Sequence, residues 1–218
     1  MITLSEENYI KAILSISLDT NSIVSTNEIA KILDTSPASV TEMIKKLQDK
    51  KLVVYEKYKG VKLSKTGRIK AFEILRKHRL WETFLVNKLD FSWGEVHDVA
   101  EQLEHIKSEK LTDKLDHFLN YPKFDPHGEP IPSKNGIIPS TKRITLSEMQ
   151  ISTKGIIMGV SLDNKEFLEH LTKINISIGT EIEAIDRIIF DQSMKIKINS
   201  KIEHISKEIA NNILIKVN

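Results

Sequence analysis

Five of the six prolines in the 218-residue chain lie within the 18 residues 122–139, together with Gly128 and Gly136. Proline has a fixed φ angle and no N–H group, so neither a helix nor a central strand accepts so many of them. We therefore predict a connecting segment over residues 121–143. This segment separates an N-terminal part, residues 1–120, from a C-terminal part, residues 144–218.

Apolar residues in the N-terminal part recur at helical spacing, which predicts that this part is mainly α-helical. Capping residues precede the second helix, and Pro37 opens the third after a short polar break at residues 34–36. Two strands around a turn at residues 57–60 are predicted to form a hairpin. The predicted helices include residues 9–16, 29–33, 37–50, 64–88, 92–107 and 108–119, and the predicted strands are 52–55 and 61–63.

The C-terminal part has the alternating apolar pattern of β-strands. Strands are predicted at residues 154–160, 181–184, 194–198 and 212–217, and a single helix at about 164–173. This pattern predicts a small β-barrel of about five strands. The fold class is therefore mainly α with a β domain, divided into residues 1–63, 64–120, 121–143 and 144–218.

The absence of cysteine excludes several classes of protein. Disulfides, thiolate zinc sites, iron–sulfur clusters and cysteine nucleophiles all need that side chain. No apolar stretch approaches the roughly 20 residues of a membrane helix, and the first residues have no signal-peptide pattern. The sequence thus predicts a soluble, cytoplasmic protein, in which any metal site uses nitrogen and oxygen ligands.

Charge is distributed unevenly along the chain, although the net charge is only +2. Residues 45–79 contain 13 lysines and arginines against three acidic residues. Residues 82–116 contain nine acidic residues against four basic ones. This division predicts an anionic partner for the first block and cations for the second. The alternative is that both blocks are simply hydrated helix surfaces.

Two helices separated by a short turn and followed by a hairpin are typical of a winged helix-turn-helix, whose second helix enters the major groove of DNA. The small or hydroxyl-bearing residues at the start of that helix permit close approach to bases and phosphates. The lysines that follow, on the helix and in the hairpin, would bind phosphates. The alternative is a small helical domain with hydrated lysines. The predicted DNA contacts are Ser36, Pro37, Ala38, Ser39, Thr41, Lys45, Lys46, Lys57 and Lys59.

A set of histidines and carboxylates in the acidic block predicts a metal site. His97, Glu101, Glu104 and His105 are spaced so that they share one face of a single helix. His78 and Glu82 form a second pair, four residues apart, on the preceding helix. Such residues suit a divalent ion, although acidic helix faces often contact only water. A hydrolytic metal enzyme is not predicted, because the chain has neither an HExxH motif nor a phosphate-binding glycine loop.

The sequence resembles the metal-dependent repressors typified by the diphtheria toxin repressor and the manganese transport regulator. The resemblance lies in DTSPASVTEMIKKLQDKKLVVYEKYKGVKLSKTGR, KHRLWETFLVNKL, WGEVHDVAEQLEHIKSEKLTDKL and DPHGEPIP, in this order along the chain. It implies a winged helix, a helical metal-binding and dimerisation domain, a tether and an SH3-like (FeoA-like) domain. It also implies a homodimer that binds a palindromic DNA operator with a divalent metal ion as co-repressor, its dimer surface formed by residues 93–119.

The resemblance also implies roles for individual residues. Glu101, Glu104 and His105 match a primary metal site, with Asn8 at the position of its first-helix ligand. His78, Glu82 and His97 match an ancillary site, to which the SH3-like domain would add Asp163 and Glu166. The other histidines, at positions 117, 127, 170 and 204, are interpreted as structural or surface residues.

Three positions bear on the choice of metal. Iron-type members have a cysteine where this chain has Glu101, and a carboxylate there favours Mn(II) over Fe(II). Manganese-type members usually have acidic residues where this chain has Asn8 and Lys11, so their compact two-metal site is not expected. The alternatives are an Fe(II)-dependent repressor of iron-uptake genes, a winged-helix regulator with a non-metal ligand, and a C-terminal domain that binds another protein.

Overall fold

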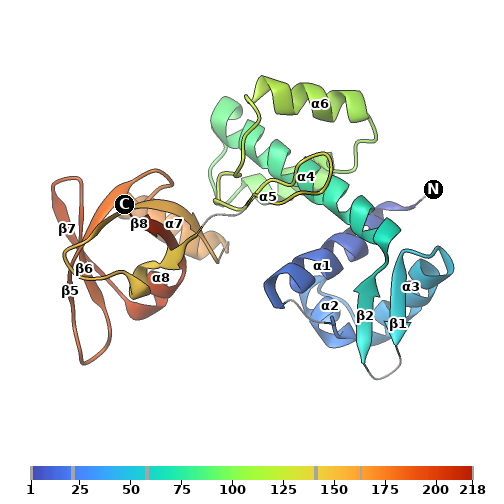
Figure 1. Ribbon diagram of the computed structural model, residues 1–218, viewed down its shortest axis with the longest axis horizontal. Helices are drawn as coiled ribbons and strands as arrows, with labels where there is room; N and C mark the ends of the chain where they lie inside the picture. Colours follow the sequence, from blue (N-terminus) through green and yellow to red (C-terminus); the bar gives the residue numbers. More distant parts are fainter. Residues whose placement is uncertain (1, 21–22, 57–58, 140–141, 163, 218) are drawn as a thin grey trace. The chain divides into compact units, whose positions relative to one another are not determined.

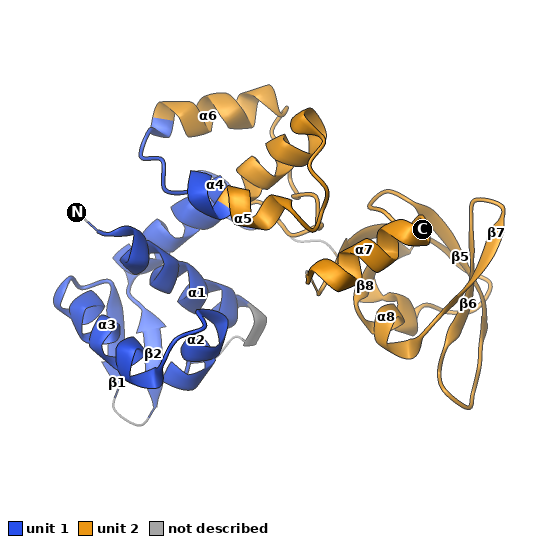
Figure 2. Ribbon diagram, turned by 180° about the vertical axis from the view of Figure 1, so that it is seen from behind, with its two compact units in different colours: residues 1–78, 101–109, 132–138 blue, residues 79–100, 110–131, 139–218 orange. Residues whose placement is uncertain are grey.

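The computed structural model describes the chain except for residues 1, 21–22, 57–58, 140–141, 163 and 218 (Figure 1). The described residues form two compact units, shown in different colours in Figure 2. Unit 1 comprises residues 1–78, 101–109 and 132–138. Unit 2 comprises residues 79–100, 110–131 and 139–218.

Unit 1 contains the winged helix-turn-helix that the sequence predicts. Its elements are α1 (Leu4–Thr20), α2 (Thr26–Ile32), α3 (Pro37–Asp49), β1 (Val53–Glu56), β2 (Gly60–Leu63) and the first half of α4 (Lys65–Leu89). The β1–β2 pair is antiparallel, which confirms the hairpin. Apolar side chains from the three short helices, the hairpin and α4 form one core, with Ile10, Ile13, Leu14, Ile29, Ile44 and Leu47 fully buried.

Local sequence explains where these helices begin. Ser25 and Glu28 form a capping box at the start of α2. Ser36 caps α3 by accepting a hydrogen bond from the backbone N–H of Ser39, and Pro37 occupies the first turn, where no intrahelical N–H bond is needed. The Ser36 cap ends the short turn between α2 and α3, and the first residues of α3 are exposed.

The acidic helix is shorter than predicted. Helix α5 spans Val96–Leu103, and α6 spans Glu109–Phe118. Glu104 and His105 lie in the turn that follows α5, so the prediction that they share one helix with His97 and Glu101 is wrong. The reason is a tighter final turn, in which the Ile106 N–H bonds to the carbonyl of Leu103, three residues earlier.

The C-terminal part of unit 2 is an antiparallel sheet of six strands among the described residues. The strand order is β3 (Ile144–Thr145), β8 (Ile213–Val217), β4 (Lys154–Val160), β5 (Glu181–Arg187), β6 (Met194–Ile198) and β7 (Lys201–Ile205). The short helix η1 (Leu146–Glu148), α7 (Lys165–Lys173) and α8 (Lys207–Asn211) accompany it. The predicted strands and helix are confirmed, whereas β3, β7 and α8 were not predicted.

The proline-rich segment is held by specific contacts. Residues 132–138 belong to unit 1 and residues 121–131 to unit 2. The Asp125 carboxylate accepts hydrogen bonds from the backbone N–H groups of His127 and Glu129, which fixes a turn. The carbonyl of His127 accepts a 2.9 Å hydrogen bond from the N–H of Val160 in β4. The segment therefore positions side chains as well as connecting domains.

Candidate metal centres and DNA-binding surface

The first candidate metal centre lies in unit 1, where the start of α1 faces the end of α5. We define the α1–α5 cluster as Glu7, Asn8, Lys11, His78, Glu101, Glu104 and His105. The Glu104 side chain is completely buried. Its Oε2 atom accepts hydrogen bonds from Nδ1 of His78 at 2.6 Å and from Nζ of Lys11 at 2.9 Å. Lys11 Nζ also lies 3.1 Å from Oε1 of Glu101.

Two oxygen atoms of this cluster are buried without a hydrogen bond. Among the described residues, Oδ1 of Asn8 and Oε1 of Glu104 have no hydrogen-bond partner. Buried polar atoms are nearly always paired, so such atoms require an explanation, and a bound ion is one. Amide and carboxylate oxygens are ligands that hard divalent cations prefer. Each of the two oxygens is therefore of a kind that a divalent metal ion would bind.

His105 is oriented as a third potential metal ligand. Its Nδ1 atom lies 2.6 Å from Oε2 of Glu7, and a carboxylate oxygen accepts, so Nδ1 carries the proton. In the neutral ring the other nitrogen, Nε2, then has a lone pair, and it lies 3.8 Å from Oε1 of Glu104. A carboxylate that fixes the tautomer of a histidine in this way is a common feature of metal sites. Glu104 and His105 could therefore hold an ion together, and Asn8 lies on α1 between Glu7, which contacts His105, and Lys11, which contacts Glu104.

The protonation state of Glu104 also suits a ligand. Burial of Glu104 acts to raise its pKa. The hydrogen bond from His78 and the charge of Lys11 act in the opposite direction and hold the pKa below its ordinary value. Glu104 is therefore a carboxylate at neutral pH, although it is fully buried.

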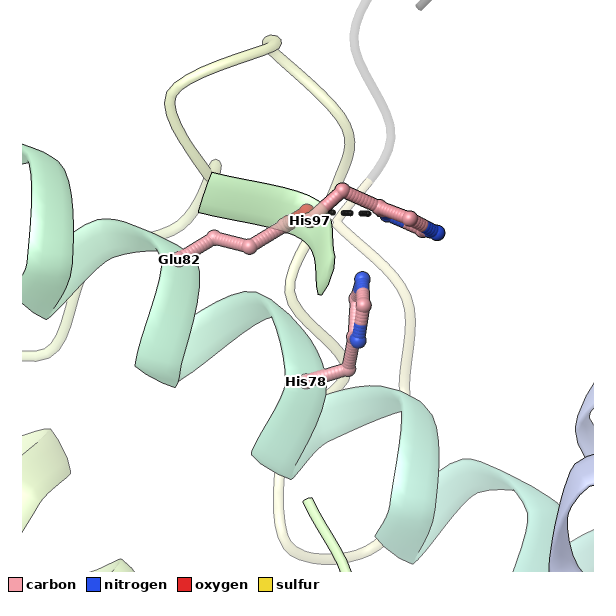
Figure 3. A group of neighbouring side chains, drawn as sticks. All are labelled: His78, Glu82 and His97. Carbon is pink, nitrogen blue, oxygen red and sulfur yellow. Dashed lines mark ion pairs between the residues drawn. The ribbon is translucent and has the colours of Figure 1, made fainter. Parts of the chain in front are cut away.

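The second candidate centre is built around Glu82 on α4. Figure 3 shows His78 one turn earlier on the same helix and His97 reaching from α5 toward the Glu82 carboxylate. His97 Nδ1 lies 3.5 Å from Oε1 of Glu82. One ligand atom from each of the three residues lies within 4.8 Å of the others. The structure thus brings together the three residues that the resemblance assigns to an ancillary site.

Glu82 belongs to another group that the sequence did not predict. Glu82, Asp125 and His127 are all buried, and their ligand atoms also lie within 4.8 Å of one another. His127 Nε2 lies 3.2 Å from the carbonyl oxygen of Trp93, which can only accept, so Nε2 donates. In the neutral ring Nδ1 then has a lone pair, and it lies 3.8 Å from Oε1 of Glu82. His127 is therefore oriented so that it could act as a ligand, a role that the sequence did not predict for it.

Arg79 supports the acidic residues of this second group. Its Nε lies 3.5 Å from Oδ2 of Asp125, and its guanidinium also contacts Glu129 and the carbonyl of Pro130. Burial nevertheless raises the pKa of Asp125 well above its ordinary value of 3.8, and the charge of Glu82 adds to that effect against the charge of Arg79. A divalent ion bound beside Asp125 would favour its ionised form.

Asp125 makes the stability of the metal-free protein depend on pH. The folded state keeps a proton that the unfolded state has lost, so the free energy of unfolding falls as pH rises from 3.8 through the raised pKa. Asp125→Asn removes this group, and we expect a flatter profile. Urea unfolding in a chelator across this pH range measures the effect. Equal slopes for wild type and Asp125→Asn would contradict it.

The candidate DNA-binding surface is the exposed start of α3. Ser36, Pro37, Ala38 and Ser39 are exposed, and Thr41 is half-buried with its hydroxyl bonded to the carbonyl of Pro37. Lys45 and Lys46 are exposed further along the helix. In the hairpin, Lys59 forms a 2.9 Å ion pair with Glu56, and Lys57 lies outside the described residues. The arrangement fits insertion of the start of α3 into a DNA groove.

Of the two ligands predicted from the C-terminal domain, Glu166 lies among the described residues. Asp163 lies outside the described residues. Glu166 is exposed in the first turn of α7, and the metal-binding groups found among the described residues do not include it. Asp125 and His127 were missed, although the DPH sequence places two ligand types within a turn of the proline-rich segment.

Comparison with known proteins gives matches along almost the whole chain. Residues 1–61 match the iron dependent repressor N-terminal DNA binding domain, residues 64–133 the iron dependent repressor metal binding and dimerisation domain, and residues 144–217 the FeoA domain. A solved manganese-dependent transcriptional repressor in complex with manganese is 31% identical, with a TM-score of 0.85 over 98% of this chain and 100% of that one. The diphtheria toxin repressor of Corynebacterium diphtheriae is 26% identical over 86% of both chains.

Other curated relatives are matched over a smaller share of their length. The chain covers 51% of the diphtheria toxin repressor of Corynebacterium jeikeium, at 32% identity. It covers 16% of a probable metal transport system membrane protein of Chlamydia trachomatis, at 42% identity.

Among the residues that the structure describes, no helix has both the length and the apolar character needed to cross a membrane.

The fold and the comparisons agree on a family. Its members are transcriptional repressors, which accords with the prediction that the chain is not an enzyme. The winged helix matches the DNA-binding domain of that family, and both candidate centres contain residues of its metal-binding and dimerisation domain. The chain belongs to the DtxR/IdeR iron-dependent repressor family of metal-dependent, DNA-binding transcriptional repressors.

Proposed function

We propose that this protein controls manganese homeostasis as a repressor whose co-repressor is Mn(II), bound in the α1–α5 cluster by Asn8, Glu101, Glu104 and His105. The observation that carries the proposal is the pair of buried, unpaired oxygens of Asn8 and Glu104 found in the described part of the chain. Oxygen ligands suit Mn(II), and the sequence has no cysteine to favour a softer ion.

A second ion would be held around Glu82, whose carboxylate lies near the imidazoles of His97 and His127. His78 completes one group of three potential metal ligands with Glu82 and His97, and Asp125 completes a second group with Glu82 and His127. Asp163 and Glu166 stay predictions as further ligands. In either group, a bound divalent ion would supply the positive charge that balances the buried carboxylates.

Helix α1 connects the first centre with the DNA-binding helix. Lys11 contacts Glu101 and Glu104 at the end of α5, and Asn8 lies about one helical turn before Lys11. Glu6 of the same helix forms a 2.7 Å ion pair with Lys50, directly after α3. Burial acts to raise the pKa of Glu6, but Lys50 and Thr3 hold it below its ordinary value. Any shift of α1 relative to α5 is therefore transmitted to α3, because the Glu6–Lys50 pair joins α1 to the end of that helix.

The active form is proposed to be a homodimer bound to a palindromic operator, with one α3 helix for each half-site. Residues 93–119 would supply the dimer surface. Ile106 is partly exposed and accessible to a partner, whereas Val96 is fully buried within its own chain and belongs to the core. Ser36, Ala38, Ser39 and Thr41 would contact bases and nearby phosphates, and Lys45, Lys46 and Lys59 the phosphates.

Fe(II) is the second candidate co-repressor. The matching family descriptions contain iron, whereas the similar solved repressor contains manganese. Fe(II) accepts the same imidazole and carboxylate donors, so geometry and metal availability decide between the two ions. A direct binding measurement with each ion is therefore needed.

Titration with Mn(II), followed by room-temperature electron paramagnetic resonance, tests the proposal without knowledge of the operator. Free aqueous Mn(II) gives a sharp multiline signal that fades when the ion is bound. We expect a saturable loss of this signal in the wild type and a smaller loss in a Glu101→Gln/His105→Ala double variant. A Glu203→Gln/His204→Ala variant changes the same residue types in β7 and is expected to bind like the wild type.

An unchanged signal at tens of micromolar protein would exclude Mn(II) as the co-repressor. Repeating the titration anaerobically with Fe(II), detected by competition with a chromogenic chelator, would then test the iron alternative. Equal Mn(II) binding by the wild type and the Glu101→Gln/His105→Ala variant would exclude the α1–α5 cluster and leave the Glu82 groups as the site.

A further inference from the structure

We propose that Lys11 is the resident counter-cation of the α1–α5 cluster, which holds α1 against the end of α5 before metal binds and weakens the affinity of the cluster for a divalent ion. This inference rests on the proposed metal site. It adds to that site a regulatory residue that carries a positive charge and therefore repels a metal ion, whereas a ligand attracts it.

The geometry places the Lys11 ammonium between two carboxylates, that of Glu101 on α5 and that of Glu104 in the turn that follows it. Its Nζ lies 3.1 Å from Oε1 of Glu101 and 2.9 Å from Oε2 of Glu104. The Lys11 side chain is only 12% exposed, and that of Glu104 is completely buried. An ion pair so shielded from solvent is screened much less than a surface pair.

The surrounding charges require such a cation. Glu7, Glu101 and Glu104 bring three carboxylates into the cluster, and a buried carboxylate is costly unless it is paired. Lys77 is also nearby, but its Nζ donates to the carbonyl of Ile106. The ammonium of Lys11 is the one placed at hydrogen-bonding distance from both Glu101 and Glu104 in the described residues.

Lys11 satisfies only part of the cluster. It bonds to Oε2 of Glu104, while Oε1 of the same carboxylate and Oδ1 of Asn8 stay unpaired among the described residues. The remaining atoms can accept an ion without removal of the lysine. An ion bound there lies close to the Lys11 ammonium, and the repulsion between the two positive charges lowers the affinity of the cluster for that ion. Because the ammonium occupies part of the cluster, there is room for one ion.

Lys11→Met tests the proposal, because methionine keeps most of the side-chain volume and removes the charge. In a chelator, we expect its Tm to be lower than that of the wild type, since two carboxylates lose their counter-cation. In the Mn(II) titration, we expect binding tighter on the order of tenfold, because the repulsion is removed. Lys11→Arg keeps the charge and is expected to resemble the wild type in both measurements.

Lys31→Met serves as the matched control, since Lys31 is exposed on α2. Equal Tm values for Lys11→Met and Lys31→Met, or unchanged Mn(II) affinity in Lys11→Met, would overturn the proposal. If no variant and no wild-type protein bound Mn(II), the proposed function would fail. The Tm comparison in a chelator would still decide whether Lys11 is a stabilising counter-cation.

Discussion

Glu104→Gln is expected to remove metal-stimulated DNA binding. The substitution keeps the shape of the side chain but replaces a charged oxygen ligand at a fully buried position. Loss of a supporting group commonly costs 10- to 100-fold in metal affinity, so we expect loss of a proposed ligand to cost about 100-fold or more. Fluorescence anisotropy measures the effect, with a labelled duplex selected by the wild-type protein from random sequences in the presence of Mn(II).

Glu73→Gln is the control for this experiment. Glu73 is exposed on α4, so its substitution makes the same change of charge and chemistry at the surface of unit 1. We expect it to keep the full metal response. Equal metal stimulation in Glu104→Gln and the wild type would remove Glu104 from the set of ligands. Loss of DNA binding with retained Mn(II) binding would instead make Glu104 a residue that couples the site to α3.

Sequence pattern predicted the elements whose signals are local. The Ser25–Glu28 capping box and the Ser36–Pro37 start of α3 depend on neighbouring residues, and both appear in the structure. Strand β7 shows the opposite case. Its residues Ile202 and Ile205 are three apart, and Ile202 is exposed at the edge of the sheet, so no alternation marks the strand.

In the candidate sites, too, some residues are predicted by local spacing and others are brought together only by tertiary contacts. Spacing along α4 predicted that His78 and Glu82 would share a helix face, whereas their meeting with His97 of α5 was implied by the family resemblance. Asp125 and His127 come from a segment without regular structure, whose path depends on its bonds to β4. Tertiary contacts of this kind have no periodic signal. The pairing of Lys11 with Glu104 is likewise a contact between residues 93 positions apart, which composition alone does not reveal.

Gly128 explains how the proline-rich segment is held, and its substitution gives the second large effect that we expect. The residue has a φ of +82°, which disfavours other residues. A Cβ atom at this position would lie 1.8 Å from the carbonyl oxygen of Met158 and 2.4 Å from Cα of Gly159. These are backbone atoms of β4, so they cannot move aside as a flexible side chain would.

Gly128→Ala therefore combines backbone strain with a clash, and we expect it to destabilise unit 2 by about 3 kcal/mol or more. Gly179→Ala separates the two causes. Gly179 has a similar φ of +84°, but nothing lies within 4 Å of its added Cβ, so only the strain of roughly 1 kcal/mol applies. Urea unfolding of both variants in a chelator measures the difference.

The same pair of variants tests whether the segment positions a metal ligand. His127 directly precedes Gly128, and its carbonyl is bonded to Val160, so displacement of the segment from β4 moves His127 away from Glu82. We expect Gly128→Ala to weaken Mn(II) binding at the Glu82 groups, and Gly179→Ala to leave it unchanged. If Gly128→Ala folded and bound Mn(II) like Gly179→Ala, the attachment to β4 would not orient His127, and the ligands on α4 and α5 would have to hold the ion without it.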